Sequence, residues 1–323
     1  MKTKTKLKLI ITIAGLLISV EIIVKKSRSP QTPTSSDSVI TIHNRTQNSN
    51  TSQQLRKSKK NVKPIVPVTR LLVNPNKKVS YSSMQKAIQN LPKKLAPADV
   101  VALRHLLNQP TEAFPKRLRP IEVNSIKNDI LDKLLRQKTL PSGIGQQLAD
   151  MSKNRKNDPV WRDYSIQYMP QYYERATQDP SIREEERTQI REALIAALDE
   201  RDGTLAGTAL IALELLSKKD QTFNRKIILE TGVDIANDET ASTSSRLTAL
   251  RVTAKEGDPN AIIDTARTLA QTGETVLLRS AALVTLGEIG NSNDQELIES
   301  YLQSDNKQIV AAAKIALTKL KKR

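Results

Sequence analysis

The chain of 323 residues contains no cysteine, only two histidines and only 3% aromatic residues. The absence of cysteine excludes a disulfide framework and a thiolate metal site, although it does not identify the redox compartment. The two histidines, His43 and His105, lie far apart in the chain and argue against a histidine-based metal site or catalytic triad. Since aromatic residues are scarce, the core must consist of Leu, Ile, Val and Ala, which suits closely packed helices better than a β-sandwich.

The net charge of +17 is distributed unevenly along the chain. Residues 1–80 carry 16 Lys and Arg against two acids (+14), and residues 81–157 carry 14 against six (+8). Residues 158–323 carry 21 against 26 (−5). The C-terminal half therefore lacks the excess of Lys and Arg expected of a phosphate-binding surface, and the basic character belongs to the N-terminal half.

Residues 1–26 have the pattern of an export signal, because four lysines precede an apolar run from Leu9 to Val24 and further basic residues follow it. The run spans roughly 24 Å as a helix, somewhat less than a bilayer core of about 30 Å, and snorkelling lysines can cover the difference. No small-x-small cleavage site follows. We predict an uncleaved signal anchor with the rest of the chain extracytoplasmic, in the periplasm or at the cell surface. Secretion after signal-peptide cleavage is the alternative, and a buried helix of the folded domain is the third interpretation.

Residues 27–80 consist mainly of Ser, Thr, Asn, Gln, Lys and Pro, with almost no periodic apolar residues. Such a composition cannot bury enough surface to offset chain entropy, which predicts a disordered linker. It functions either as a solvated tether or through electrostatic contact with anionic lipid or cell-wall polymer. Residues 81–157 show helical periodicity and are predicted to be a helical extension or degenerate repeats. The expected helices are Ser83–Leu91, Pro97–Asn108, Pro120–Lys138 and Ile144–Ser152.

A helical phrase recurs through residues 158–323, in which Ala209, Ala249, Ala282 and Ala313 take equivalent places at spacings of 40, 33 and 31 residues. Periods in this range indicate stacked helix pairs that bury their apolar faces against their neighbours. The first helix opens at Asp158-Pro159, a capping residue followed by a first-turn proline. The expected helices that follow are Ile182–Leu198, Leu205–Leu216, Phe223–Ile235, Thr243–Lys255, Asn260–Leu269, Val276–Ile289, Gln295–Leu302 and Gln308–Lys321.

The segment Val276-Leu277-Leu278-Arg279-Ser280-Ala281-Ala282-Leu283-Val284-Thr285-Leu286-Gly287-Glu288-Ile289-Gly290 resembles a HEAT repeat, in particular the short bacterial HEAT-like type. The resemblance extends over residues 158–323 and is clearest in this unit. It implies an all-α fold, an α-solenoid of helix pairs that usually engages other proteins. Some proteins with such repeats are bilin lyases or read damaged DNA. The lack of His and Cys in residues 158–323 argues against the first activity, and their charge argues against the second.

Two side-chain patterns stand out on the repeats. Trp161, Tyr164, Tyr168 and Tyr172 follow helical spacing and form a stripe, flanked by Arg162 and Arg175. The stripe is either a core that joins the extension to the repeats or an exposed platform for a partner, since Tyr and Trp are favoured at binding hot spots. Arginine also recurs in one register, at residues 162, 246 and 279, which predicts pairing with acids or carbonyl groups of the adjacent repeat.

The sequence thus predicts a non-enzymatic, membrane-anchored extracytoplasmic scaffold that binds a protein partner, with no cofactor and no catalytic or metal-binding residues. It gives neither the identity of the partner nor the oligomeric state, and nucleic acid is not the favoured ligand. One alternative is binding of nucleic acid or another anionic polymer through the basic N-terminal half. The other is a lyase-like protein or enzyme accessory, for which Asp163 and Glu174 are carboxylates to consider by default.

Overall fold

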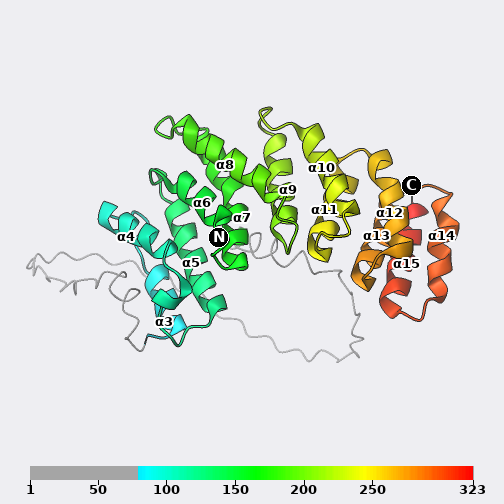
Figure 1. Cartoon of the computed structure of the whole chain (residues 1–323), viewed down its shortest axis with the longest axis horizontal. Helices are drawn as coiled ribbons and strands as arrows, with labels where there is room; N and C mark the ends of the chain where they lie inside the picture. The colour runs from blue at the N-terminus through cyan, green and yellow to red at the C-terminus, as the bar shows by residue number, and fades with distance from the viewer. Residues whose placement is uncertain (1–78, 323) are drawn as a thin grey trace, which may run out of the picture. The chain divides into compact units, whose positions relative to one another are not determined.

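The computed structural model describes residues 79–322, which fall within one compact unit, Val66–Arg323. In this part of the chain the secondary structure consists of thirteen α-helices and two 3₁₀ helices, without a strand, so the prediction of an all-α fold is confirmed (Figure 1). The elements are α3 (Tyr81–Gln89), α4 (Pro97–Leu107), η1 (Thr111–Ala113), α5 (Pro120–Leu135), α6 (Ile144–Lys153), α7 (Pro159–Ala176), α8 (Glu184–Ala197), α9 (Leu205–Ser217), α10 (Arg225–Asn237), α11 (Thr243–Glu256), α12 (Pro259–Thr272), α13 (Val276–Ile289), α14 (Asp294–Ser300), η2 (Tyr301–Gln303) and α15 (Lys307–Leu320).

The predicted anchor, residues 1–26, and nearly all of the predicted linker lie outside the described residues. None of the helices between residues 79 and 322 combines the length and the apolar character that a membrane span requires.

Each helix expected between residues 79 and 322 corresponds to one helix of the structure, and local signals mark the starts of several of them. The side chain of Asp158 accepts a hydrogen bond from the backbone N–H of Val160 at the start of α7, and Asp258 caps α12 in the same way. Helix α5 ends at Leu135, three residues before the expected position. Beyond it, the Arg175 side chain binds the carbonyl oxygens of Leu135, Gln137 and Lys138, which a continuing helix would use internally.

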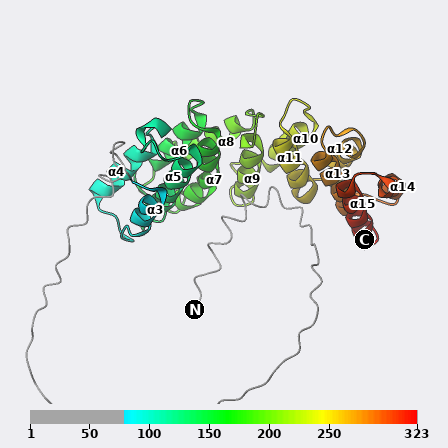
Figure 2. The ribbon, with the colours of Figure 1, turned by 90° about the horizontal axis from the view of Figure 1, so that it is seen from below.

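The helices stack in chain order (Figures 1 and 2). The first helices of successive pairs contact one another, from α7 to α9, α11, α13 and α15. The second helices pack beside them, as α10 does against α9 and α11. The extension α3–α6 continues the same packing through contacts of α5 and α6 with α7. This is the nearest-neighbour arrangement of a solenoid-like stack.

Small residues allow the helices to approach closely. Ala209, Ala249, Ala282 and Ala313 are all completely buried, as their equivalent places in the repeat require. The closest approach is at Gly287 on α13, where a Cβ atom would lie 2.4 Å from the Cα atom of Ala316 on α15. At these positions the core therefore contains small side chains or none, and neighbouring helix backbones approach closely.

The recurrent arginines join successive pairs. The Nε atom of Arg162 donates to the carbonyl oxygen of Ser152 (2.7 Å), and that of Arg246 donates to the carbonyl oxygen of Ala236 (3.0 Å). Each acceptor lies ten residues earlier, near the end of the preceding pair. Each arginine also pairs with a carboxylate, Glu200 or Glu274. The predicted role is confirmed for these two, whereas the Nε atom of Arg279 is buried without a hydrogen-bond partner among the described residues.

Candidate functional site

The aromatic stripe lies on α7, and burial decides between its two interpretations. Trp161 and Tyr172 are at most 1% exposed, Tyr168 is 6% exposed, and Tyr164 is half-buried. Helix α7 contacts α5 and α6 of the extension as well as α8 and α9 of the repeats, so these rings fill the space between them. The stripe is therefore core that joins the two parts. The interpretation as an exposed partner platform is corrected, because buried rings offer no surface to a ligand.

The two flanking arginines are also engaged within the fold. The guanidinium of Arg162 is buried against Ser152 and pairs with Glu200 at 3.1 Å. The guanidinium of Arg175 is occupied by the carbonyl groups beyond α5, with a distance of 2.6 Å from its Nη2 atom to the carbonyl oxygen of Gln137. Neither side chain is free to bind a partner as the platform interpretation requires.

A buried carboxylate anchors the middle of α7. The Tyr172 hydroxyl donates to Oε2 of Glu186 at 2.8 Å. The backbone N–H groups of Gly143 and Gly145, at the start of α6, donate to the same carboxylate at 3.2 and 3.3 Å. The Tyr172 ring lies so close to Gly145 that a Cβ atom there would be 2.5 Å from it. Burial and the hydrogen bond with Glu186 raise the pKa of Tyr172, so the cluster holds its phenol protonated and joins α6, α7 and α8.

Lys127 is a buried cation beside the first ring of the stripe. Its Nζ atom lies 5.7 Å from the centre of the Phe114 ring and 5.4 Å from that of Trp161. Burial lowers the pKa of Lys127 to about 8, while the carboxylates of Asp158 and Glu112 oppose this shift. The spacing of Lys127 from Val123 and Ile130 places it on the apolar face of α5, a signal visible in the sequence but not used above.

This lysine predicts a pH dependence of stability. Its pKa is lower in the folded state than in the unfolded chain, so the unfolded state binds more protons between about pH 8 and the ordinary lysine pKa of 10.5. The free energy of unfolding of the natural protein, relative to Lys127→Met, is therefore expected to rise with pH through that window. The rise is at most roughly 3 kcal/mol, because one pKa unit corresponds to about 1.4 kcal/mol. Urea unfolding of both proteins from pH 7 to 10.5 measures the difference, and a constant difference would contradict the assignment.

The carboxylates considered for acid–base chemistry are held in polar contacts within the stack. Asp163 accepts hydrogen bonds from the hydroxyl groups of Thr204 (3.0 Å) and Thr208 (2.7 Å) at the start of α9. Glu174 forms an ion pair with Lys219 at 2.6 Å. Among the described residues, no group of three or more His, Cys, Asp or Glu side chains is placed to hold a metal ion.

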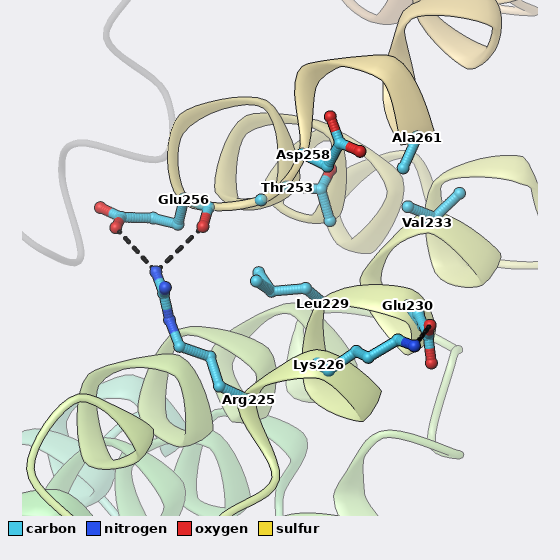
Figure 3. A pocket seen from close by; sticks show the side chains of 10 residues that line it. Arg225, Lys226, Leu229, Glu230, Val233, Thr253, Glu256, Asp258 and Ala261 are labelled. Carbon is cyan, nitrogen blue, oxygen red and sulfur yellow. Dashed lines mark hydrogen bonds and ion pairs between the residues drawn. The ribbon is translucent and has the colours of Figure 1, made fainter.

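A groove of about 540 Å³ lies between α10, the end of α11 and the start of α12 (Figure 3). Leu229, Val233 and Thr253 supply its less polar surface. Charged side chains of both signs line the rest, namely Arg225, Lys226, Glu230, Glu256 and Asp258, and Gly257 and Ala261 complete the lining. The sequence analysis did not find this groove, because its lining comes from three helices whose separation is set by packing.

A four-membered ion-pair network closes one end of the groove. Lys218 binds Glu214 at 2.8 Å and Glu256 at 2.7 Å, and Arg225 binds both carboxylates at 3.3 Å. Arg225 also donates to the backbone carbonyl oxygen of Glu256 at the end of α11. Figure 3 shows these two contacts of Arg225 with Glu256 across the groove. The carboxylates raise the pKa of Lys218, and its ammonium lowers the pKa of Glu256, which favours the ionised form of both groups. The network links α9, α10 and α11.

No protein-family model matches the chain, and no curated protein matches it in sequence. Among solved structures, the chain is similar to human deoxyhypusine hydroxylase in complex with glycerol. The two chains are 13% identical with a TM-score of 0.25, and the alignment covers 80% of this chain and 96% of that chain. The fold itself defines the class of the described region, an all-α protein of stacked helices.

One prediction from the sequence is corrected here. The sequence analysis above expects a protein without enzymatic activity. A solved structure with which this chain aligns is named as a hydroxylase, an enzyme, and we withdraw that expectation. A TM-score of 0.25 carries no argument about a reaction or a substrate of this chain.

Proposed function

We propose that the protein is a membrane-anchored scaffold whose HEAT-like α-solenoid lies outside the cytoplasm and binds a protein partner through the groove between α10 and α12. The basic and apolar pattern of residues 1–26 supports the anchor, and the succession of helix pairs supports the HEAT-like assignment. The observation that carries the binding site is the groove of about 540 Å³, with aliphatic side chains between charges of both signs.

The lining of the groove favours a protein segment over a polyanion. Its basic side chains are Arg225 and Lys226, and they face the carboxylates of Glu230, Glu256 and Asp258. A nucleic acid would meet three carboxylates there, whereas a peptide can present an aliphatic side chain to Leu229 and Val233 and opposite charges to the rim. Arg225 is held by the ion-pair network, so the wall is preorganised for such a contact.

The rim offers a test that leaves the fold intact. Lys226 and Glu230 form an exposed pair one turn apart on α10, at 3.8 Å. The double variant Lys226→Glu/Glu230→Lys keeps the pair and the net charge but exchanges the two charges on the groove wall. Its stability is expected to change by less than about 0.5 kcal/mol, because exposed pairs contribute little. Partner binding is expected to fall by about tenfold or more, since like charges then face each other across the contact.

The readout is photocrosslinking of the full chain in the membranes of its native cells. A photoreactive residue replaces exposed Ala261 on the groove wall, and the control position is Ile315, which is exposed on α15. We expect a discrete crosslinked protein from position 261 that is lost in the charge-exchanged variant. Equal crosslinking from position 315, or a product that is unaffected by the exchange, would refute binding through the groove. Recovery of the chain in the soluble fraction would refute the anchor.

A further inference from the structure

We propose that the edge of the stack where α5 and α7 begin binds the surface of an anionic lipid membrane. The proposal rests on the proposed function in that it names the face that an anchored stack turns toward the membrane. We call it the basic–aliphatic edge and define it by Lys116, Arg117, Ile121, Lys153, Lys156 and Val160.

The two segments that form this edge lie side by side. The side-chain amide of Asn124 on α5 donates to Oδ1 of Asp158, which caps α7, at 2.9 Å. The Nζ atom of Lys127 lies between the rings of Phe114 and Trp161, at 5.7 and 5.4 Å from their centres. These contacts bring the loop before α5 to the first turn of α7. Lysines and arginines that are far apart in the sequence thereby share one edge.

The edge combines exposed aliphatic side chains with exposed bases. Ile121 and Val160 are 54% and 41% exposed, and each is the second residue of its helix, after Pro120 or Pro159. Six exposed bases precede the two helices: Arg119 and Arg155 are ion-paired, and Lys116, Arg117, Lys153 and Lys156 define the edge. Covering the two aliphatic side chains with a second apolar surface is favourable, because it removes their apolar area from water.

Several carboxylates near this edge are already engaged. Glu122 binds Arg119, and Glu200 binds Arg155 and Arg162. Asp158 accepts from Asn124 and from the backbone of Val160, and Asp158 and Glu112 both act on buried Lys127. None of the four bases that define the edge makes an ion pair within residues 79–322. Their charge therefore remains available to an external anion.

A lipid surface fits this combination better than a nucleic acid does. Lysine stems and aliphatic side chains enter the region between headgroups and acyl chains while the ammonium groups reach the phosphates. Each base near an anionic leaflet adds to the electrostatic attraction. A single-stranded nucleic acid would require exposed rings for stacking, but Phe114 and Trp161 are buried, and it would leave Ile121 and Val160 in water.

The opposite edge of the same helices provides an internal control. Lys93 and Lys94 lie there, since Gln137 beyond α5 binds the backbone at residues 93 and 95. Lys138 is also exposed there, but no large exposed aliphatic residue lies in the loops of that edge. Both edges are therefore basic, and the edge where α5 and α7 begin adds exposed aliphatic side chains in the first turns of these helices, Ile121 and Val160.

The absence of cysteine makes a specific test possible, because one introduced cysteine gives a single labelling site. A polarity-sensitive fluorophore is attached to the full chain at Ile121→Cys or Val160→Cys, and at the control positions Lys138→Cys and Ile315→Cys. Ile315 is an exposed aliphatic residue in the middle of α15. The chain is mixed with vesicles of neutral phosphatidylcholine, or with vesicles containing about 30% phosphatidylserine. We expect a blue shift at positions 121 and 160 with the anionic vesicles, and no shift at the controls.

Two further results are expected. The shift should disappear in about 1 M salt, where the Debye length is about 3 Å. It should also fall at least about fivefold when Lys116, Arg117, Lys153 and Lys156 are all replaced by alanine, since their combined attraction is lost. These exposed side chains make no ion pair in the described residues, and the thermal unfolding of the variant checks that the fold is retained.

The outcomes separate this proposal from the anchor. If the chain floats with both kinds of vesicle but the fluorescence at positions 121 and 160 does not shift, membrane binding by the edge is refuted and the predicted anchor is supported. A blue shift with anionic vesicles, but no flotation with neutral vesicles, supports membrane binding by the edge and refutes the predicted membrane anchor. An equal shift at Lys138→Cys overturns insertion and reduces the contact to general electrostatic attraction. An equal shift on adding a single-stranded RNA homopolymer assigns the edge to polyanions and overturns the lipid assignment.

Discussion

Replacement of Glu186 by alanine is expected to lower the free energy of unfolding by about 3–5 kcal/mol, one of the largest effects of any single change in this chain. The Glu186 side chain is only 3% exposed and accepts from the N–H groups of Gly143 and Gly145 and from the Tyr172 hydroxyl. Its removal leaves three donors without an acceptor, of which the Gly145 N–H and the Tyr172 hydroxyl are buried and the Gly143 N–H is partly buried. Two of them are the N–H groups at the start of α6, which have no partner within that helix.

The neighbouring residue supplies a matched control. Glu185 lies in the same first turn of α8 but is exposed, so Glu185→Ala is expected to change stability by less than about 0.5 kcal/mol. Urea unfolding of both variants gives the midpoint and the slope, and a shifted midpoint with an unchanged slope identifies a loss of native stability. Equal effects of the two substitutions would show that the carboxylate does not join α6, α7 and α8 as described.

Gly287→Ala is expected to destabilise the C-terminal end of the stack by about 2–3 kcal/mol, although alanine favours a helix over glycine by about 1 kcal/mol. The added Cβ atom would lie 2.4 Å from the Cα atom and 2.6 Å from the carbonyl oxygen of Ala316. These are backbone atoms, which cannot move aside as a flexible side chain can. Helices α13 and α15 must therefore separate. Because each helix pair in a stack depends on its neighbours, hydrogen exchange should accelerate first in α15.

Ser280 on the same helix is the control for this substitution. Its hydroxyl oxygen is buried and has no hydrogen-bond partner within the described residues. Ser280→Ala removes this unsatisfied group and should leave stability unchanged or raise it by up to about 1 kcal/mol. If Gly287→Ala were also neutral, the close approach of α13 and α15 would not limit the packing at this end.

Much of the fold could be predicted from local signals in the sequence. Asp158-Pro159 marks the start of α7 because a capping carboxylate and a first-turn proline act within a few residues of each other. The helix from Val276 to Ile289 has the bounds that its apolar period predicts. Helix α14 is the least regular case, because it ends at Ser300 and continues as a 3₁₀ turn where the sequence pattern predicts helix to Leu302.

The candidate sites depended on contacts between distant residues. The period of Trp161, Tyr168 and Tyr172 indicates a helix face, but a buried face and a binding face have the same period. The stripe lies in the core because other helices pack around α7 and cover the face that carries these rings. The groove was missed for the converse reason. Leu229 and Glu256 carry no mutual signal in the sequence, and they line one groove only because α10, α11 and α12 pack at a particular separation.

The sequence by itself determined that the described part of this protein is helical and located its helices to within a few residues, because capping and apolar periodicity act over a few residues. It also determined the register of the arginines and alanines that recur in the stack. Only the tertiary structure decided that the aromatic stripe is core, that Lys127 is a buried cation, and that a mixed-charge groove and a basic–aliphatic edge exist. Burial and ion pairing arise between helices that meet only after folding, and no local pattern records which of them will meet.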